Sequence, residues 1–208
     1  MSQEDRIRWD QRYREGAYAT REHPSAFLRE RLPWIGRPQP GSLALDLACG
    51  RGRNALFLAR QGFHVDALDI SAEALQGARD AAAAESLDDI RWTQHDLDLG
   101  LKSGLENGLE SLSPDHLYDV ALIIRYLDLS LLQAAANCLR PGGHLLCEVH
   151  LQTALPVAGP SNPEFRAGPG EVKQAASDLQ ILLYQEGLIQ DPDGETVCLA
   201  RLHARRPQ

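Results

Sequence analysis

The feature that most constrains this chain is an alternation of short apolar runs with helix-like segments between residues 42 and 151. The apolar runs are typical of strands buried on both faces, and they lie at 42–48, 63–70, 90–97, 118–127 and 144–151. Segments with helical spacing lie between most of them, at 53–62, 72–87 and 130–139. Because strand–helix–strand units with short connections form parallel sheets covered by helices, the alternation predicts an α/β fold.

The two ends of the chain depart from this alternation. A helix is expected over 24–36, before the first strand. Near the other end, segments 178–187 and 195–206 are separated by the turn 191–194 and have no helix between them, which predicts an antiparallel hairpin. We therefore expect a Rossmann-like, seven-stranded, mostly parallel sheet with helices on both faces and a C-terminal antiparallel hairpin.

The length of 208 residues suits one domain of this kind. We expect a single domain over 41–208, preceded by a helical N-terminal lead-in or lid over 1–40. Segment 98–117 is longer than a usual connection and has no clear periodicity, so it is interpreted as a surface insertion without assigned chemistry.

Composition narrows the possible partners. Lys and Arg total 21 against 29 Asp and Glu, a net charge of -8, which argues against a nucleic-acid partner. The four cysteines are scattered singly, which predicts neither a disulfide framework nor a metal site and favours a reducing compartment. The charged N-terminus and the lack of an apolar run of about 18 residues predict a cytoplasmic protein without a membrane span. No obligate protein partner is evident.

Acidic residues and glycines gather where the predicted strands end. Asp46 precedes a loop containing Gly50 and Gly52, Asp69 ends the second strand, and Asp96 ends the third. In open parallel sheets, ligands bind beyond the carboxyl ends of the strands. Glycines let a ligand approach the backbone, and the following helix directs free N–H groups toward it. These positions predict a nucleotide-like ligand at this edge of the sheet.

Two kinds of cofactor suit such a loop. The spacing Gly50-x-Gly52-x-x-Ala55, with Asp69 downstream, also satisfies the dinucleotide fingerprint of nicotinamide-dependent oxidoreductases. A carboxylate at Asp46, however, repels a pyrophosphate and attracts an ammonium or sulfonium group. S-adenosylmethionine carries both cations and no phosphate. An NAD-dependent oxidoreductase and a non-catalytic S-adenosylmethionine-binding module stay open as alternatives.

The same segments resemble the class I S-adenosylmethionine-dependent methyltransferases. The resemblance lies in the first two motifs over 45–71, the fourth-strand motif over 118–127, and the turn and fifth strand over 139–150. Within that superfamily the chain is similar to the small-molecule branch related to tellurite-resistance TehB and thiopurine methyltransferases. The features behind this are W-D-x-R-Y-R-E-G at 9–16, His23-Pro24-Ser25, C-G-x-G-R-N at 49–54, and P-G-E before a strand ending in Y-Q-E-G.

The resemblance implies a position for each part of the cofactor. The methionine part would lie against Asp46, Ala48, Cys49, Gly50 and Gly52, with Asn54 nearby on the far side of the loop. The ribose hydroxyls would meet Asp69, and the adenine would meet Ile70, Asp96 and Leu97. The fourth strand would pass under the sulfonium at Ile124 and Arg125. Related sequences often have a histidine soon after Arg-Tyr, whereas this chain continues with Leu127 and Asp128.

The predicted reaction is transfer of a methyl group to a small-molecule acceptor such as a thiol or an oxyanion, leaving S-adenosylhomocysteine. In-line displacement needs positioning more than a base, so no catalytic residue is assigned. Arg125, Tyr126 and His150 end two predicted strands and are candidates to face the acceptor. The alternative roles are an ion pair for Arg125, core packing for Tyr126 and a structural position at the strand end for His150. Tyr13, with Trp9 one helical turn before it, is a candidate to fold the lead-in over the cofactor and acceptor.

Overall fold

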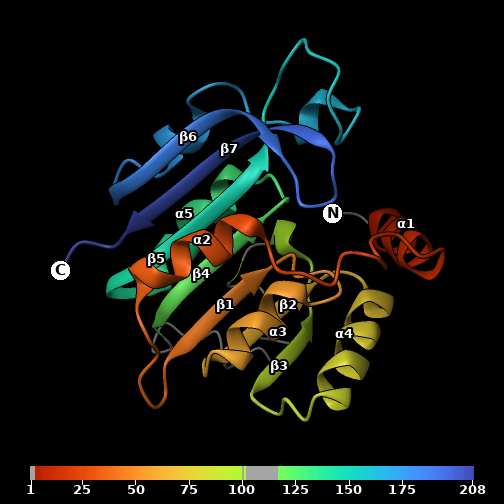
Figure 1. Ribbon diagram of the computed structural model, residues 1–208, viewed down its shortest axis with the longest axis vertical. Helices are drawn as coiled ribbons and strands as arrows, with labels where there is room; N and C mark the ends of the chain where they lie inside the picture. Colours follow the sequence, from red (N-terminus) through yellow and green to blue (C-terminus); the bar gives the residue numbers. More distant parts are fainter. Residues whose placement is uncertain (1–2, 100, 102–116) are drawn as a thin grey trace.

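The computed structural model describes residues 3–99, 101 and 117–208 (Figure 1). Seven strands form one sheet in the order β3-β2-β1-β4-β5-β7-β6. Pairing is parallel from β3 to β5, and β7 runs antiparallel to both β5 and β6. The strands are β1 (Leu43–Leu47), β2 (His64–Asp69), β3 (Ile90–Gln94), β4 (Tyr118–Ile124), β5 (Leu139–His150), β6 (Gln180–Gln190) and β7 (Thr196–Arg205). The predicted fold class and hairpin are confirmed.

Helices cover both faces of this sheet. One apolar core joins the front of the sheet to α2, α3 and α4, and a second joins the other face to α5 and α6. The helices are α1 (Gln3–Arg14), α2 (Ala26–Ile35), α3 (Arg53–Arg60), α4 (Ala72–Ala84), α5 (Leu129–Asn137) and α6 (Glu171–Ala175). Short 3-10 helices lie at η1 (Leu97–Leu99) and η4 (Pro163–Phe165). Every residue of β4 is buried, as its central place requires.

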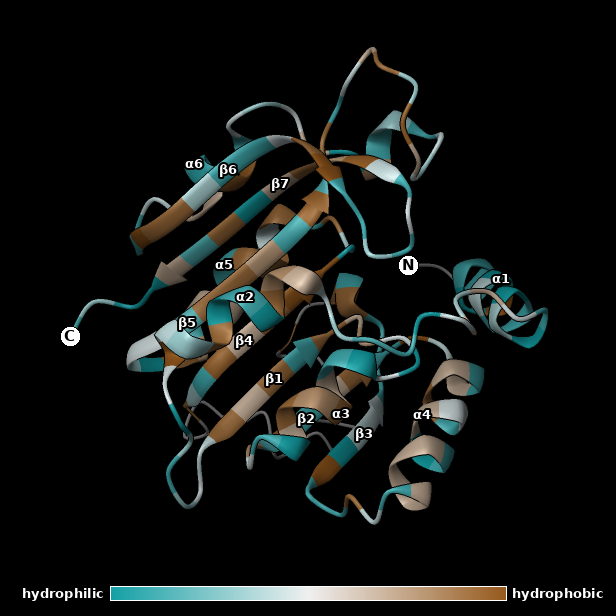
Figure 2. Ribbon diagram, in the orientation of Figure 1, coloured by the Kyte–Doolittle hydropathy of each residue, from teal (hydrophilic) through white to brown (hydrophobic). Residues whose placement is uncertain are grey.

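The N-terminal helix α1 is different, because it is hydrophilic almost all round and buries only Tyr13 (Figure 2). It lies beside α4, where Asp10 accepts a hydrogen bond from the Ser71 hydroxyl at 2.7 Å (Figure 1). Ser71 also caps α4, and Ser25 caps α2, as side-chain oxygens do at helix N-termini. Helix α1 is therefore attached to the domain mainly by polar contacts, whereas α2 packs into the apolar core.

Two sequence-derived boundaries were wrong. The third strand ends at Gln94, so Asp96 lies two residues beyond it. The fifth strand begins at Leu139, and its pairing with β4 is interrupted before it resumes at His144, so the expected turn at 140–143 is a bulge within the strand. Gly142, at φ +79°, provides the left-handed residue that this bulge needs.

Most of the predicted insertion 98–117 lies outside the described residues. The prediction that it is a surface insertion is therefore not tested. Among the described residues, no helix is both long and apolar enough to cross a membrane.

Candidate functional site

The glycine loop lies where the sheet reverses its strand order, because β1 pairs with β2 on one side and with β4 on the other. Ala48, Gly50 and Gly52 all have positive φ, at 56°, 56° and 76°. The Cys49 N–H donates to the Leu68 carbonyl at 2.9 Å, which holds the loop against β2. The loop thus turns sharply beyond the carboxyl end of β1, the position at which such sheets bind ligands.

Asp46 is a buried carboxylate with unused hydrogen-bonding capacity. It is 1% exposed, and its Oδ2 has no hydrogen-bond partner within the described residues. Burial raises the pKa of Asp46 from 3.8 to about 7, against the opposing effects of the Arg53 charge and the Ala55 backbone N–H. Buried polar atoms normally have partners, so this oxygen fits a cationic ligand group that would approach the loop.

Asp69 lies at the end of β2 and supports the loop from the side. Its Oδ2 accepts from the Gly50 N–H at 2.8 Å, and its Oδ1 accepts from the Ser71 N–H at 2.9 Å. Burial raises the pKa of Asp69 to about 6, although both hydrogen bonds oppose this. A carboxylate has about four acceptor sites, so two such bonds leave capacity for a pair of hydroxyl groups. The next residue, Ile70, is buried.

Asp96 and Leu97 follow β3 and begin η1. Asp96 is half-buried, and its carboxylate accepts from the Asp98 N–H at 3.1 Å. Leu97 is buried in the core with only 2% of its surface exposed, so little of it remains for a ligand. Asp46 and Asp69 lie at the carboxyl ends of β1 and β2, and Asp96 lies just beyond β3, so the strand order places the three carboxylates at one edge of the sheet.

Tyr13 covers the loop from α1. A Cβ atom built on Gly50 would lie 2.7 Å from the Tyr13 hydroxyl oxygen, so only glycine fits there. Burial, and then the nearby Asp69 carboxylate, raise the pKa of Tyr13 well above its usual value. The Arg51 guanidinium donates to the Tyr13 carbonyl at 2.8 Å. Trp9 packs beside Tyr13 with ring centroids 5.9 Å apart. The lead-in therefore touches the loop, and its role as a lid stays a prediction.

Arg125 directly follows β4 and has a left-handed conformation, with φ at 65°. Its Nε lies 3.2 Å from the Glu148 carboxylate, and its Nη2 lies 3.1 Å from the Asp191 carboxylate. Glu148 is 2% exposed and also pairs with Arg201 at 2.7 Å. Arg125 thus forms the ion pairs that were given as its alternative role. Its guanidinium links the end of β4 to β5 and to the turn between β6 and β7. Ile124, just before it, is buried.

His150 and Tyr126 have unlike surroundings. His150 is buried at the end of β5, and its Nδ1 has no partner within the described residues. Burial, and then the charge of Arg125, lower the pKa of His150 to about 3, so the imidazole is neutral at pH 7. Tyr126 is half-buried and donates through its hydroxyl to Asp98 at 3.0 Å. Burial and Asp98 raise the pKa of Tyr126 well above its usual value.

Asn54 holds the lead-in to the domain. It is buried, and its amide oxygen accepts from the Ser25 N–H at 2.8 Å. Sequence reasoning missed two contacts of the lead-in with the turn between β6 and β7. Arg21 Nε forms an ion pair with Asp193 at 2.5 Å, and His23 Nε2 lies 3.5 Å from the same carboxylate. Sequence reasoning also missed Glu148, although a lone acidic residue within an apolar strand is a signal that could have found it.

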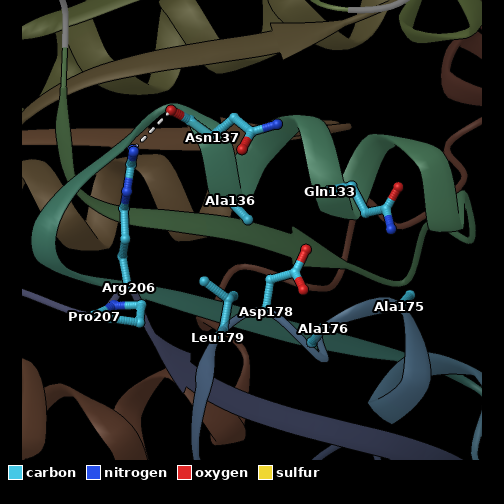
Figure 3. A pocket seen from close by; sticks show the side chains of 9 residues that line it. All are labelled: Gln133, Ala136, Asn137, Ala175, Ala176, Asp178, Leu179, Arg206 and Pro207. Carbon is cyan, nitrogen blue, oxygen red and sulfur yellow. Dashed lines mark hydrogen bonds between the residues drawn. The ribbon is translucent and has the colours of Figure 1, made fainter.

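A groove also lies away from these residues. It has a volume of about 300 Å³ and lies between α5 and α6 (Figure 3). Figure 3 shows the side chains that line it, among them Asp178 and Gln133, and Arg206 donates to the Asn137 carbonyl at 3.0 Å. None of the candidate site residues lines it.

Comparison with protein families matches residues 44–143 to the family described as a methyltransferase domain. This part of the chain is a methyltransferase domain. The match covers β1 to the first part of β5, including the glycine loop, Asp69 and Asp96. The resemblance stated from the sequence motifs is thereby confirmed for these residues.

Two curated relatives match at moderate identity. Hemagglutinin 1 of Eikenella corrodens is 29% identical over 160 residues, covering 73% of this chain and 49% of the relative. The ubiquinone biosynthesis O-methyltransferase of Pectobacterium carotovorum is 33% identical over 113 residues, covering 50% of this chain and 41% of the relative. The chain thus spans half or less of the length of these relatives.

Among solved structures, TehB from Haemophilus influenzae is similar, with a TM-score of 0.65 and 21% identity. The similarity covers 86% of this chain and 61% of TehB. At this identity it bears on the fold alone, and it confirms the class I methyltransferase fold.

Proposed function

We propose that this chain transfers a methyl group from S-adenosylmethionine to a small-molecule acceptor such as a thiol or an oxyanion. The observation that carries the proposal is Oδ2 of Asp46, which is buried beside a left-handed glycine loop and has no partner among the residues that the structure describes. A cationic, phosphate-free cofactor suits this carboxylate, whereas a pyrophosphate would be repelled by it. The methyltransferase family match over the same residues supports this choice over a nicotinamide cofactor.

The residues present fit this cofactor. Asp46 would accept a hydrogen bond from the ammonium group of the cofactor's methionine part. The backbone at Gly50 and Gly52 would allow that part to approach closely. Asp69 has acceptor capacity for the ribose hydroxyls, and Ile70 with Asp96 would enclose the adenine. Ala48 and Cys49 complete the loop, and burial with the nearby Asp69 raises the pKa of the Cys49 thiol, which therefore stays neutral. The cofactor would supply a methyl group bonded to a sulfonium, and the neutral thioether S-adenosylhomocysteine would be the leaving group.

The chain's own contribution is positioning and exclusion of water. Tyr13 covers the loop, while Asp10 and Arg14 bind α4 through Ser71 and Glu73, so α1 can close over bound ligands. Positioning in a water-poor site accounts for much of the acceleration of an in-line displacement. His150 is neutral at pH 7, and its Nδ1 has no partner in the described part of the chain, but its lowered pKa makes it a weak base. This favours acceptors that are nucleophilic without proton removal.

The acceptor would bind between the lead-in and the carboxyl ends of β4 and β5. The ubiquinone biosynthesis enzyme among the relatives supports a small-molecule acceptor, and the net charge of -8 argues against nucleic acid. We further propose that residues 1–40 act as the lid and that 41–208 form the single methyltransferase domain. We also propose that the reaction needs neither a metal ion nor an obligate protein partner.

A thermal-shift assay tests the cofactor first. S-adenosylhomocysteine should raise Tm, as should S-adenosylmethionine, whereas NAD should not. Asp69→Ala should reduce the ligand-induced shift, measured from the variant's own unliganded Tm, and the exposed Asp88→Ala should not. Stabilisation by NAD alone contradicts the proposal, and an unchanged shift in Asp69→Ala contradicts the ribose role.

Turnover is tested separately with labelled S-adenosylmethionine and a panel of thiols, tellurite and selenite. Transfer to at least one acceptor is expected, and it should fall in Asp46→Asn but not in Asp88→Ala. Cofactor binding without transfer to any small molecule would favour the binding module over the enzyme.

A further inference from the structure

A second polar groove lies at the opposite edge of the sheet, at the amino ends of the parallel strands. It has a volume of about 150 Å³ and lies where the α2–β1 connection meets the start of β4, the start of β5 and the end of β7. Figure 1 shows the tails of β4 and β5 and the arrowhead of β7 at this end of the sheet. Arg37, Asp119, Arg140, His144 and Arg205 provide its charged and titratable groups. The methyltransferase site at the carboxyl ends shares none of these residues.

The groove carries an excess of positive charge in a chain whose net charge is -8. Three of its side chains are arginines, and its single carboxylate, Asp119, is already used. Asp119 pairs with Arg140 and accepts from the Leu43 N–H at 2.8 Å. Within the described residues, Arg205 donates only to the Gly142 carbonyl, at 3.0 Å, and Arg37 has no charged partner. Guanidinium groups thus face the groove without carboxylates to match them.

A buried chain of hydrogen bonds fixes the form of His144. The Arg31 Nε–H donates to His203 Nδ1 at 3.0 Å, so the proton of the neutral His203 is on Nε2. His203 Nε2 lies 2.8 Å from His144 Nδ1, which must therefore accept. The neutral His144 consequently carries its own proton on Nε2. Like the guanidinium groups, this ring nitrogen is a hydrogen-bond donor.

The charges around His144 show the sign of the local potential. Arg140 and Asp119 approach it from the strands on one side, while Arg205 and His203 approach it from β7. Burial, and then the charges of Arg205 and Arg140, lower the pKa of His144, with Asp119 opposing them. The groove is therefore positive overall, and a bound anion would reverse this effect on the imidazole.

We propose that this groove binds a phosphate-like oxyanion, either free or as the phosphate group of a small metabolite. Three arginines face its one carboxylate, which is already paired, so an anion fits and a cation does not. Arginine presents paired N–H groups that match the oxygens of a phosphate. A volume of about 150 Å³ suits a single phosphate group better than a dinucleotide. Gly142 keeps the space clear, because a Cβ there would lie 3.1 Å from Arg205 Nη2.

Isothermal titration with inorganic phosphate at pH 7.5, at constant ionic strength set by chloride, tests the proposal on the full chain. Saturable binding is expected, and Arg37→Gln should weaken it about tenfold or more, because a hydrogen bond to a charged group is lost. Arg29→Gln is the matched control, since Arg29 is exposed on α2 and does not line the groove. Equal weakening by both variants, or no saturation, overturns the proposal.

A second readout keeps the test independent of folding and of the methyltransferase proposal. Phosphate should raise the pKa of His144, followed by NMR in the wild-type protein, while the exposed His64 should not respond. Glycerol phosphate in place of inorganic phosphate separates the two sources, because only a metabolite site binds the ester more tightly. An unchanged pKa of His144 at saturating phosphate would overturn the assignment of the site.

Discussion

Asp46→Asn is expected to stabilise the protein in the absence of ligand and to weaken its binding of S-adenosylhomocysteine. Asp46 is 1% exposed, one of its oxygens is unpartnered within the described residues, and burial raises its pKa from 3.8 to about 7. An ionised carboxylate in this setting lowers the stability of the fold. Such a cost is expected where a residue is kept for a ligand.

The size of the effect follows from the pKa. The folded state holds the Asp46 proton more tightly than the unfolded state, so this group lowers stability as pH rises through the interval from 3.8 to about 7. At about 1.4 kcal/mol per pKa unit, the full loss above pH 7 is about 4 kcal/mol. Asparagine removes the charge but buries an amide, which cancels roughly half of the gain. The expected net gain is about 2 kcal/mol at pH 8, or about 4–8 °C in Tm.

Thermal unfolding at pH 8 and pH 5 measures this gain, with the exposed Asp88→Asn as the control. At pH 5 the folded Asp46 is protonated, so the advantage of Asp46→Asn should shrink by more than half. Binding of S-adenosylhomocysteine at pH 8 should weaken by about tenfold or more, as loss of a charged contact implies. A variant no more stable than wild type at pH 8, or one that binds the ligand normally, refutes the reasoning.

Three further substitutions test the architecture around the site. Gly52→Ala puts a methyl group 2.4 Å from the Trp92 ring at a φ of +76°, so we expect a loss of about 2–4 kcal/mol in urea unfolding; a loss below about 1 kcal/mol means that the loop adapts. Glu148→Gln leaves two arginines without their buried carboxylate and should cost about 3–5 kcal/mol in the same assay, whereas a near-neutral effect would show that solvent screens the cluster. Tyr13→Ala should accelerate amide hydrogen exchange over 48–52 and leave exchange in β7 unchanged. Exchange in the loop at the wild-type rate would contradict the proposal that Tyr13 covers it.

Much of the fold could be predicted because its determinants are local. Buried strands, the capping serines Ser25 and Ser71, and the turn 191–194 each appear as short patterns. The bulge at 140–143 could not be predicted, because Pro-Gly-Gly is equally typical of a turn, and only the pairing of β5 with β4 keeps it within a strand.

The candidate site divides in the same way. Asp46 and Asp69 could be predicted from their positions at the ends of strands, since topology alone brings those ends together. The pairing of Arg125 with Glu148 and Asp191 could not, because these carboxylates are 23 and 66 residues away in sequence, one on the neighbouring strand β5 and the other in the turn of the antiparallel hairpin. The closeness of Tyr13 to Gly50 likewise depends on how α1 packs against α4, which polar contacts decide.

The most direct test of the central claim is photo-crosslinking with S-adenosylmethionine that carries an azide on its adenine, followed by peptide mapping. We predict that the label falls within 69–70 or 94–97, the residues that would enclose the adenine beyond β2 and β3. Excess S-adenosylhomocysteine should suppress this label. Suppressible labelling in the groove between α5 and α6, at 133–137 or 175–179, would place the cofactor elsewhere and contradict the account.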